Sequence, residues 1–384
     1  MKKNFIDSAL NTVVLVLPVL CFGGAERCMV NMANWWAARG VKVYLITFHK
    51  DVQDYELDSR IIWLGLDDYE EAVPAETVWT EENYNIACLR KAIEFCLASS
   101  VARPLPVISF LTRMNLRTIL ATKDLPCRTV VSERSYPPSN PFPEREEKLR
   151  CQVYPQAHKV VLQTETGRDF WGRNILTEEK MSVIPNPVSE SYCSETFVEN
   201  NFVHGSNLLP DSRFLVTAGR LECEKRIDHF IRLFSVLVLD FPEINALVLG
   251  EGSLREELEA LVCAEGLEDR VHMPGALEDL KGIFEQAELF VLTSKFEGFP
   301  NVLLESMASG CPVLSYDCLT GPREIIRDGV DGILIPPGDE HALQQSAKKI
   351  LGNDALRFSM AREAKSVCER FHPDKIMLNW EKFF

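Results

Sequence analysis

The sequence lacks any long apolar stretch that is free of charged residues. Its most hydrophobic segment, residues 13–20, is far shorter than the ~18–20 residues that a membrane-spanning helix needs. Two lysines precede this segment, but no small-x-small cleavage site of a signal peptide follows it. The segment runs instead into Gly23 and Gly24, which favours a buried strand followed by a turn. We therefore expect a chain that can touch a membrane but does not cross it.

Metal-binding patterns are also missing. None of the 12 cysteines forms a C-x-x-C pair or a zinc-like spacing. Their scatter is typical of reduced, mostly buried thiols in a cytosolic protein. No D-x-D motif follows an apolar strand, and the acidic pair Asp67 and Asp68 lies in a loop without that context. We therefore expect neither a metal ion nor a cofactor.

Length and charge limit the class of protein. A formal net charge of −15 argues against nucleic acid as a partner. Nearly all of the excess of acidic side chains falls after residue 188, so the first half is close to neutral and locally basic. With 384 residues, 46% of them hydrophobic, the chain is long enough for two domains with separate cores.

Apolar runs alternate with amphipathic segments in both halves, a pattern that predicts βαβ units and parallel sheets. Examples are the apolar runs at 41–48 and 214–218. A polar stretch of low periodicity separates the halves. We predict an α/β fold with a first domain at 1–188, a linker at 189–212, a second domain at 213–365 and a terminal segment at 366–384.

The segment E-G-F-P-N-V-L-L-E at 297–305 places two carboxylates around a helix start. It follows an apolar run at 289–292 that we interpret as a buried strand. Pro300 suits the first helical position and Gly310 suits the helix end. The loop would carry Glu297 and several N–H groups to the carboxyl edge of a sheet, where open α/β sheets bind ligands and a helix N-terminus favours anions. For either glutamate alone, a loop carboxylate or a solvated helix residue is the more ordinary interpretation.

A second loop, G-R-L-E-C-E-K at 219–225, follows another predicted strand and carries two cations, Arg220 and Lys225. Arginine can grip phosphate oxygens bidentately, while lysine supplies a compact charge. If the loop stood alone, a surface ion pair between Lys225 and Glu222 or Glu224 would be the simpler interpretation.

Together the two loops resemble the donor-site signature of retaining glycosyltransferases of family 4. That family has the GT-B architecture of two facing Rossmann-like domains, and the resemblance covers nearly the whole chain. It implies that Glu297 contacts the transferred sugar, that Glu305 binds the nucleotide ribose, and that Arg220 and Lys225 hold the donor diphosphate. Fixed cations there would stabilise the charge that builds up as the diphosphate leaves. It also implies that the segment 366–384 contains a helix that crosses back to pack on the first domain.

The resemblance assigns the other donor contacts mainly to backbone groups. It implies that Gly275 frames the base and that Gly24, after the first strand, approaches the diphosphate from the first domain. The predicted catalytic residues are Arg220, Lys225 and Glu297, and the predicted donor-binding residues are Gly24, Arg220, Lys225, Gly275, Glu297, Gly298, Phe299, Asn301, Val302 and Glu305.

The acceptor side has weaker signals. Relatives in the family often carry a histidine where this chain has Glu133 and Arg134. The role of that histidine is therefore either absent or taken by one of these two residues. Either residue could equally form a structural ion pair. Arg113 begins a basic, partly apolar region that could bind a pyrophosphate-linked lipid, although such faces are usually only solvated. With residues 21–27, this region is similar to bacterial transferases that add N-acetylgalactosamine or related hexoses to undecaprenyl-diphosphate oligosaccharides.

The resemblance therefore implies a metal-independent hexosyltransferase. We expect it to move GalNAc, GlcNAc, Gal or Glc from a UDP-sugar, with retention of configuration, to a lipid-diphosphate-linked oligosaccharide or a polysaccharide precursor. We expect it in the cytoplasm, with peripheral contact at the inner face of the cytoplasmic membrane. Two alternatives stay open: a nucleotide-sugar epimerase on a similar scaffold, which needs no acceptor, and a non-catalytic nucleotide-sugar-binding protein.

Overall fold

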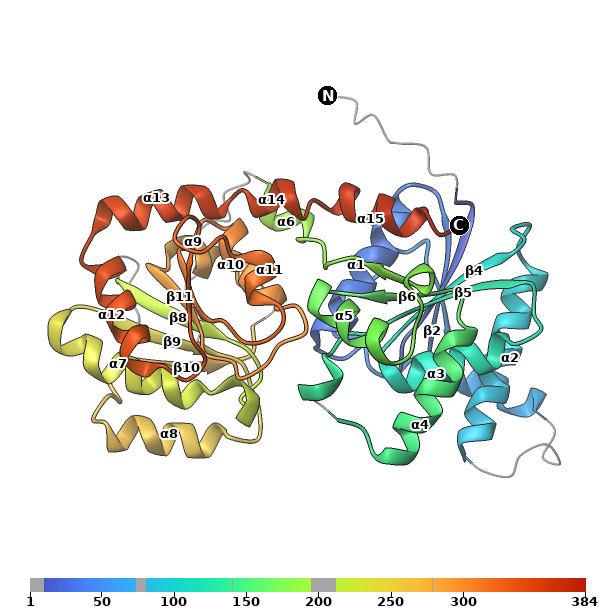
Figure 1. Cartoon of the computed structure of the whole chain (residues 1–384), viewed down its shortest axis with the longest axis horizontal. Coiled ribbons are helices and arrows are strands. Elements are labelled where there is room, and N and C mark those ends of the chain that lie inside the picture. Colours follow the sequence, from blue (N-terminus) through green and yellow to red (C-terminus); the bar gives the residue numbers. More distant parts are fainter. Residues whose placement is uncertain (1–9, 74–80, 140, 195–211, 278) are drawn as a thin grey trace. The chain divides into compact units, whose positions relative to one another are not determined.

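The computed structural model describes residues 10–73, 81–139, 141–194, 212–277 and 279–384 (Figure 1). The chain forms two compact units. The first comprises Met1–Pro187 and Asp374–Phe384, and the second comprises Val188–Pro373. Each unit is a parallel sheet with helices on both faces. None of the helices in the described ranges is long and apolar enough to span a lipid bilayer.

The first unit has a seven-stranded sheet in the order β3-β2-β1-β4-β5-β6-β7, and all its strand pairs are parallel. Its strands are β1 (Thr12–Val16), β2 (Lys42–Thr47), β3 (Ile62–Gly65), β4 (Leu105–Phe110), β5 (Cys127–Ser132), β6 (Lys159–Leu162) and β7 (Met181–Val183). Its helices are α1 (Gly24–Ala38), α2 (Glu81–Ala98), α3 (Thr112–Thr122), α4 (Glu144–Val153), α5 (Glu165–Asn174) and α15 (Pro373–Glu381).

Successive residues of β1 point into two different cores. Val13 and Leu15 pack in a cluster with α1 and α15, whereas Val14 and Val16 pack in a cluster with α2 and α3. Because both faces of the sheet are covered, the strand is a continuous apolar run rather than an alternating one.

Helix α15 completes the first of these cores and lies beside α1 (Figure 1). The ring of Trp380 packs 5.9 Å from that of Phe110. The indole N–H of Trp35 donates to Asp374 at 2.8 Å, and that of Trp36 donates to Glu381 at 3.1 Å. The end of the chain is therefore an integral part of the first unit.

The boundary of this returning segment differs from the prediction. We placed it at 366–384, but residues up to Pro373 belong to the second unit. The reason is α14 (Val367–Arg370), whose Val367 is fully buried in the second unit together with Phe371. Only the residues from Asp374 onward pack in the first unit.

The second unit has a six-stranded parallel sheet in the order β10-β9-β8-β11-β12-β13. Its strands are β8 (Phe214–Ala218), β9 (Asn245–Leu249), β10 (Val271–Gly275), β11 (Leu289–Leu292), β12 (Val313–Tyr316) and β13 (Ile333–Ile335). Its helices are α6 (Glu190–Cys193), α7 (Ile227–Asp240), α8 (Arg255–Ala264), α9 (Lys281–Gln286), α10 (Asn301–Ala308), α11 (Pro322–Ile325), α12 (Glu340–Leu351), α13 (Asp354–Ala364) and α14.

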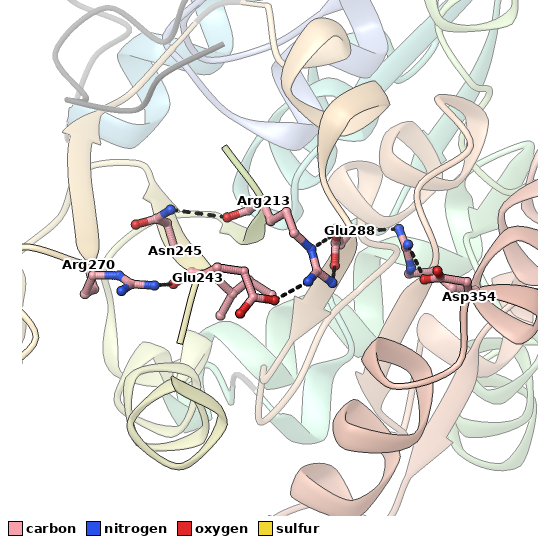
Figure 2. Close-up of polar contacts among 8 residues, drawn as sticks. Arg213, Glu243, Asn245, Arg270, Glu288 and Asp354 are labelled. Carbon is pink, nitrogen blue, oxygen red and sulfur yellow. Dashed lines mark hydrogen bonds and ion pairs between the residues drawn. The ribbon is translucent and has the colours of Figure 1, made fainter. Parts of the chain in front are cut away.

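An ion-pair network lies at the amino ends of these strands (Figure 2). Arg213, just before β8, holds Glu288, just before β11, through two bonds of 2.6 and 2.8 Å. Arg357 of α13 lies 3.7 Å from Glu288 and pairs with Asp354 at 2.7 Å. The network holds α13 at the amino edge of the sheet. Among the described residues, the loops at the carboxyl edge take no part in it.

The predicted linker at 189–212 begins as packed structure. Tyr192 of α6 is buried in the core of the second unit, and the N–H of Val188 donates to the carbonyl of Phe371 at 3.0 Å. The buried ammonium of Lys281 donates to the carbonyls of Ser191 and Ser194 at 2.9 and 2.8 Å. Residues 189–193 therefore belong to the second unit, and the part of the predicted linker at 195–211 lies outside the described residues.

Candidate functional site

The candidate site lies where the strand order of the second sheet reverses. From β8 the chain continues to β9 on one side, whereas β11 leads to β12 on the other. Open α/β sheets bind ligands outside the carboxyl ends of the two strands at such a point. The loop after β8 carries Arg220 and Lys225, and the loop after β11 carries Glu297. The fold thus brings together the two loops that the sequence singled out separately.

The centre of the site is an ion pair between Lys225 and Glu297. Lys225 Nζ lies 2.7 Å from Glu297 Oε1, and the two side chains are 18% and 9% exposed. The hydroxyl of Ser294 donates to the same oxygen at 2.6 Å. Glu297 Oε2 makes no hydrogen bond with any described residue. One carboxylate oxygen is therefore fixed by two donors, and the other is available to a ligand.

Backbone contacts join the two loops. The hydroxyl of Thr293 donates to the carbonyls of Lys225 and Arg226 at 3.0 and 2.8 Å. The N–H of Lys295 donates to the carbonyl of Glu224 at 2.7 Å. Arg226 has a left-handed backbone, with φ of +48°, directly before α7. These contacts fix the position of Lys225 relative to the loop that carries Glu297.

Arg220 lies at the surface of the same loop. Its side chain is 69% exposed, and Nη2 lies 3.0 Å from Oε1 of Glu224. The Glu224 side chain is only 17% exposed, so the pair joins an exposed cation to a largely covered carboxylate. The binding of a diphosphate by Arg220 stays a prediction.

Helix α10 presents its N-terminus beside Glu297. We predicted Pro300 as the first residue of the helix. The helix instead begins at Asn301, and Pro300 is its N-cap. The amide N–H groups of Gly298 and Val302 make no hydrogen bond within the described part of the chain. Such groups at a helix N-terminus favour a negatively charged ligand. Gly310 follows the helix end with φ of +80°, as predicted.

Two further residues that the sequence predicted to bind the sugar donor lie on α10 and in the loop before it. Glu305 is 4% exposed, which excludes the interpretation as a solvated helix residue. The ring of Phe299 is buried and meets Phe371 edge-on at 5.7 Å. The Phe299 side chain therefore serves the core, and only its backbone can serve a ligand.

Glycines allow three neighbouring strand ends to touch. Gly250 has φ of +138°, and a Cβ placed there would lie 1.9 Å from the carbonyl oxygen of Gly219. The N–H of Gly250 donates to the carbonyl of Gly275, whose φ is +97°. A side chain at Gly250 would therefore push apart the loops after β8 and β9. The sequence predicted a ligand role for Gly275 but gave no sign of this close packing.

The loop after β12 supports the site, although the sequence did not single it out. The hydroxyl of Thr320 donates to the carbonyl of Glu297. A Cβ on Gly321, which has φ of +97°, would lie 2.7 Å from Cδ of Pro300. Burial and the nearby Glu297 carboxylate raise the pKa of Cys318 to about 12, so this thiol stays protonated at neutral pH. The sequence did contain a signal for this loop, because the turn residue Gly321 follows β12, the strand beside β11.

The first unit has a corresponding reversal between β1 and β4. Gly24 is the first residue of α1, whereas the sequence predicted a turn at Gly23 and Gly24. The hydroxyl of Tyr55 bonds to the N–H and the carbonyl of Gly23 at 2.9 and 3.0 Å, which fixes this turn. Leu111, directly after β4, has φ of +74°, a strained backbone for a residue other than glycine. The approach of Gly24 to a donor diphosphate stays a prediction.

The acceptor-side candidates Glu133 and Arg134 are packed into the first unit. Glu133 is buried, which raises its pKa, and its carboxyl group accepts hydrogen bonds from Thr112 and Tyr154. The Arg134 guanidinium lies 3.3 Å above the Phe110 ring and donates to Asn186 at 2.7 Å. These contacts favour structural roles, and a catalytic role for either residue stays a prediction.

The basic region predicted for a lipid diphosphate is largely paired. Arg113 lies 3.1 Å from Glu146, and Arg117 lies 2.7 Å from Glu82. Arg128 donates to the main-chain carbonyl of Phe383 at 3.0 Å. A lipid diphosphate at this face would have to displace the carboxylates that already neutralise Arg113 and Arg117.

No group of three or more His, Cys, Asp and Glu side chains able to hold a metal ion is found among the described residues. The donor set of the site instead consists of a lysine, an arginine, hydroxyls, backbone amides and two glutamates, which suits an anionic and hydroxylated ligand.

Solved structures share this architecture. Sucrose-phosphate synthase from Thermosynechococcus elongatus superposes with a TM-score of 0.78 at 17% identity, covering 97% of this chain and 98% of that one. TarM of S. aureus, solved with Fondaparinux, alpha-GlcNAc-glycerol and UDP, gives a TM-score of 0.77 at 14% identity, covering 97% and 99%. At these identities the likeness concerns the fold. Two parallel-sheet, Rossmann-like units of this kind are the GT-B fold.

Two family models place the chain more closely. Residues 22–192 match Glycosyltransferase Family 4, and residues 199–367 match Glycosyl transferases group 1. The chain is therefore a glycosyltransferase of these families.

Curated relatives are similar over different lengths. An exopolysaccharide phosphotransferase of Streptomyces coelicolor is 30% identical over 267 residues, 69% of this chain, but the chain spans only 27% of that relative. A transferase of Campylobacter jejuni is 26% identical over 383 residues, 100% of this chain and 98% of the relative. Its name describes an alpha-1,4-N-acetyl-D-galactosaminyltransferase that acts on a GalNAc-GalNAc-diNAcBac-PP-undecaprenol glycan.

Proposed function

We propose that the protein transfers a hexose from a UDP-sugar to a hydroxyl group of a lipid-diphosphate-linked oligosaccharide or polysaccharide precursor, with retention of configuration. The observation that carries the proposal is the Lys225–Glu297 pair of 2.7 Å at the reversal of the sheet, because a cation suits phosphate oxygens and the carboxylate beside it suits sugar hydroxyls. The Campylobacter relative, similar over its whole length, supports the hexosamine donor and the lipid-linked acceptor.

Each residue of the site has a role in this reaction. Lys225, Arg220 and the amides at the start of α10 neutralise the charge that gathers on the departing UDP. Glu297 accepts hydrogen bonds from hydroxyls of the transferred sugar, and Glu305 accepts them from the ribose. These cations and amides supply the electrostatic stabilisation, so we propose that the reaction needs neither a metal ion nor a cofactor.

The bond changes follow from retention. The acceptor oxygen bonds to the anomeric carbon on the face from which the diphosphate leaves, while the bond between that carbon and the phosphate oxygen breaks. The acceptor proton passes to the departing phosphate oxygen. No protein nucleophile takes part, and UDP leaves with the electron pair of the broken bond.

The acceptor places the reaction at a membrane. We propose that the protein works at the cytoplasmic face of the membrane as a peripheral protein. The support for this step is the undecaprenol glycan named for the relative, since Arg113 and Arg117 already have carboxylate partners. No nucleic acid is a partner in this proposal.

A donor screen tests the proposal. The protein is incubated with UDP-GalNAc, UDP-GlcNAc, UDP-Gal, UDP-Glc or GDP-mannose, with and without undecaprenyl-diphosphate-linked saccharides, and nucleotide release is followed. We expect one UDP-sugar to be consumed, faster with the lipid acceptor, and NMR of the product should show the anomeric configuration of the donor. Conversion of the donor without acceptor would favour an epimerase, and UDP binding without donor consumption would favour a binding protein.

A further inference from the structure

Two adjacent hydroxyl residues, Thr293 and Ser294, connect the halves of the candidate site. Both are buried, with about 1% of each residue exposed. The Thr293 hydroxyl bonds to the backbone of Lys225 and Arg226, whereas the Ser294 hydroxyl bonds to the carboxylate of Glu297. One residue therefore holds the loop of the cation, and the next holds the carboxylate.

The ion pair alone does not hold Glu297 during the proposed reaction. Lys225 Nζ is 2.7 Å from Glu297 Oε1 without a ligand, but a bound diphosphate competes for the same ammonium group. When Lys225 turns to the phosphates, Glu297 loses its counter-ion. Its remaining side-chain hydrogen bond among the described residues is the one from Ser294, at 2.6 Å to the same oxygen.

We propose that Ser294 is a positioning residue that keeps Glu297 Oε1 in place while Lys225 holds the diphosphate, so that Oε2 is presented to the hydroxyls of the transferred sugar. This inference rests on the proposed function. The hydrogen bond from Thr320 to the carbonyl of Glu297 fixes the backbone of the same residue, so the Ser294 hydroxyl controls only the side chain.

The test compares Ser294→Ala with Thr293→Val, which removes a buried hydroxyl from the adjacent position. Loss of a buried hydrogen bond to a charged group corresponds to ~10–100-fold in rate, so Ser294→Ala should lower kcat by that factor and leave the Kd for UDP within about twofold. Thr293→Val should instead weaken UDP binding several-fold, because it loosens the backbone at Lys225. Ser294→Thr, which keeps the hydroxyl, should recover a large part of kcat.

A binding measurement tests the same inference without turnover. The ratio of the Kd for UDP to the Kd for the preferred UDP-sugar reports how much the sugar contributes to binding. Ser294→Ala should lower this ratio in the parent protein and leave it unchanged in a Glu297→Gln background, since Ser294 acts through Glu297. Additive effects in the two backgrounds, or equal losses of kcat and UDP affinity, would overturn the inference.

The two proposals fail differently. If the parent protein consumes no nucleotide-sugar, the proposed transfer fails, and the ratio of dissociation constants still decides the role of Ser294. If transfer occurs but Ser294→Ala keeps both kcat and the ratio within about twofold of the parent values, only the role of Ser294 is refuted.

Discussion

Replacing Lys225 by methionine should affect stability and turnover for separate reasons. Methionine keeps most of the length and apolar stem of lysine but removes the charge. The change leaves Glu297 as a nearly buried carboxylate whose remaining side-chain donor in the described structure is Ser294. Removing one partner of a fully buried ion pair costs ~3–5 kcal/mol, whereas an exposed pair contributes ~0–1 kcal/mol. With side chains 18% and 9% exposed and Ser294 still in place, we expect a loss of ~2 kcal/mol of unfolding free energy.

Lys225→Met should also lower kcat. Loss of a fixed group that stabilises the leaving charge lowers kcat by ~10²–10³-fold. A double variant, Lys225→Met with Glu297→Gln, removes the uncompensated carboxylate charge. We expect it to recover most of the lost stability and none of the turnover. Denaturation by urea and steady-state release of UDP measure the two quantities on the same samples.

A remote ion pair supplies the control. Lys348→Met breaks a bond of 2.6 Å to Asp240, but these side chains are 33% and 51% exposed, so neither stability nor turnover should change much. The reasoning would be refuted if Lys225→Met turned over at the parent rate, or if the double variant recovered activity together with stability.

Three other predictions follow from packing and protonation. Gly250→Ala should cost at least ~2 kcal/mol of unfolding free energy, since it adds a Cβ 1.9 Å from the Gly219 carbonyl at a strained backbone, and chemical denaturation would show it. Glu288→Ala should also lower stability, by ~1–3 kcal/mol, because it leaves Arg213 without its bidentate partner, yet UDP affinity measured by calorimetry should stay the same. Burial lowers the pKa of His229 below its ordinary value of 6.5, so the unfolded chain binds the proton first, and the melting temperature should fall as the pH drops below about 6.5.

Each of these has its own control. Gly282→Ala, on α9, meets no atom within 4 Å and should be neutral, so equal losses at Gly250 and Gly282 would contradict the packing argument. If Glu288→Ala weakens UDP binding, the two edges of the sheet are coupled in a way that the fold does not suggest. His229→Gln should flatten the acid limb of the stability profile, and an unchanged profile would exclude His229 as its source.

Local patterns predicted the elements around the site well. The apolar runs at 214–218 and 289–292 coincide with β8 and β11. Strand β3 was missed because it is a short, partly exposed edge strand. Helix α3 was missed because buried polar residues interrupt its apolar pattern, and these residues satisfy their hydrogen bonds internally, as Asn115 does with Ser132 and Tyr154.

The candidate site shows where local reasoning ends. The motif at 297–305 was visible because its residues are close in sequence. The partner of Lys225 could not be predicted in this way, because Glu222 and Glu224 are nearer in sequence. The structure pairs Lys225 with Glu297, 72 positions away. Glu222 instead accepts hydrogen bonds from the N–H and hydroxyl of Ser253, which lower its pKa. Such contacts depend on which strands are neighbours, and the order of strands in a sheet is not encoded in any single segment.

The return of α15 to the first unit has a consequence for biosynthesis. A nascent chain leaves the ribosome from its N-terminus, and early domains usually fold before later ones are made. Here the first unit cannot bury the surface around Trp36 and Phe110 until Trp380 has emerged. That apolar surface stays exposed while the whole second unit is translated, so we expect the first half of the chain to depend on chaperones that bind such surfaces until α15 has been made.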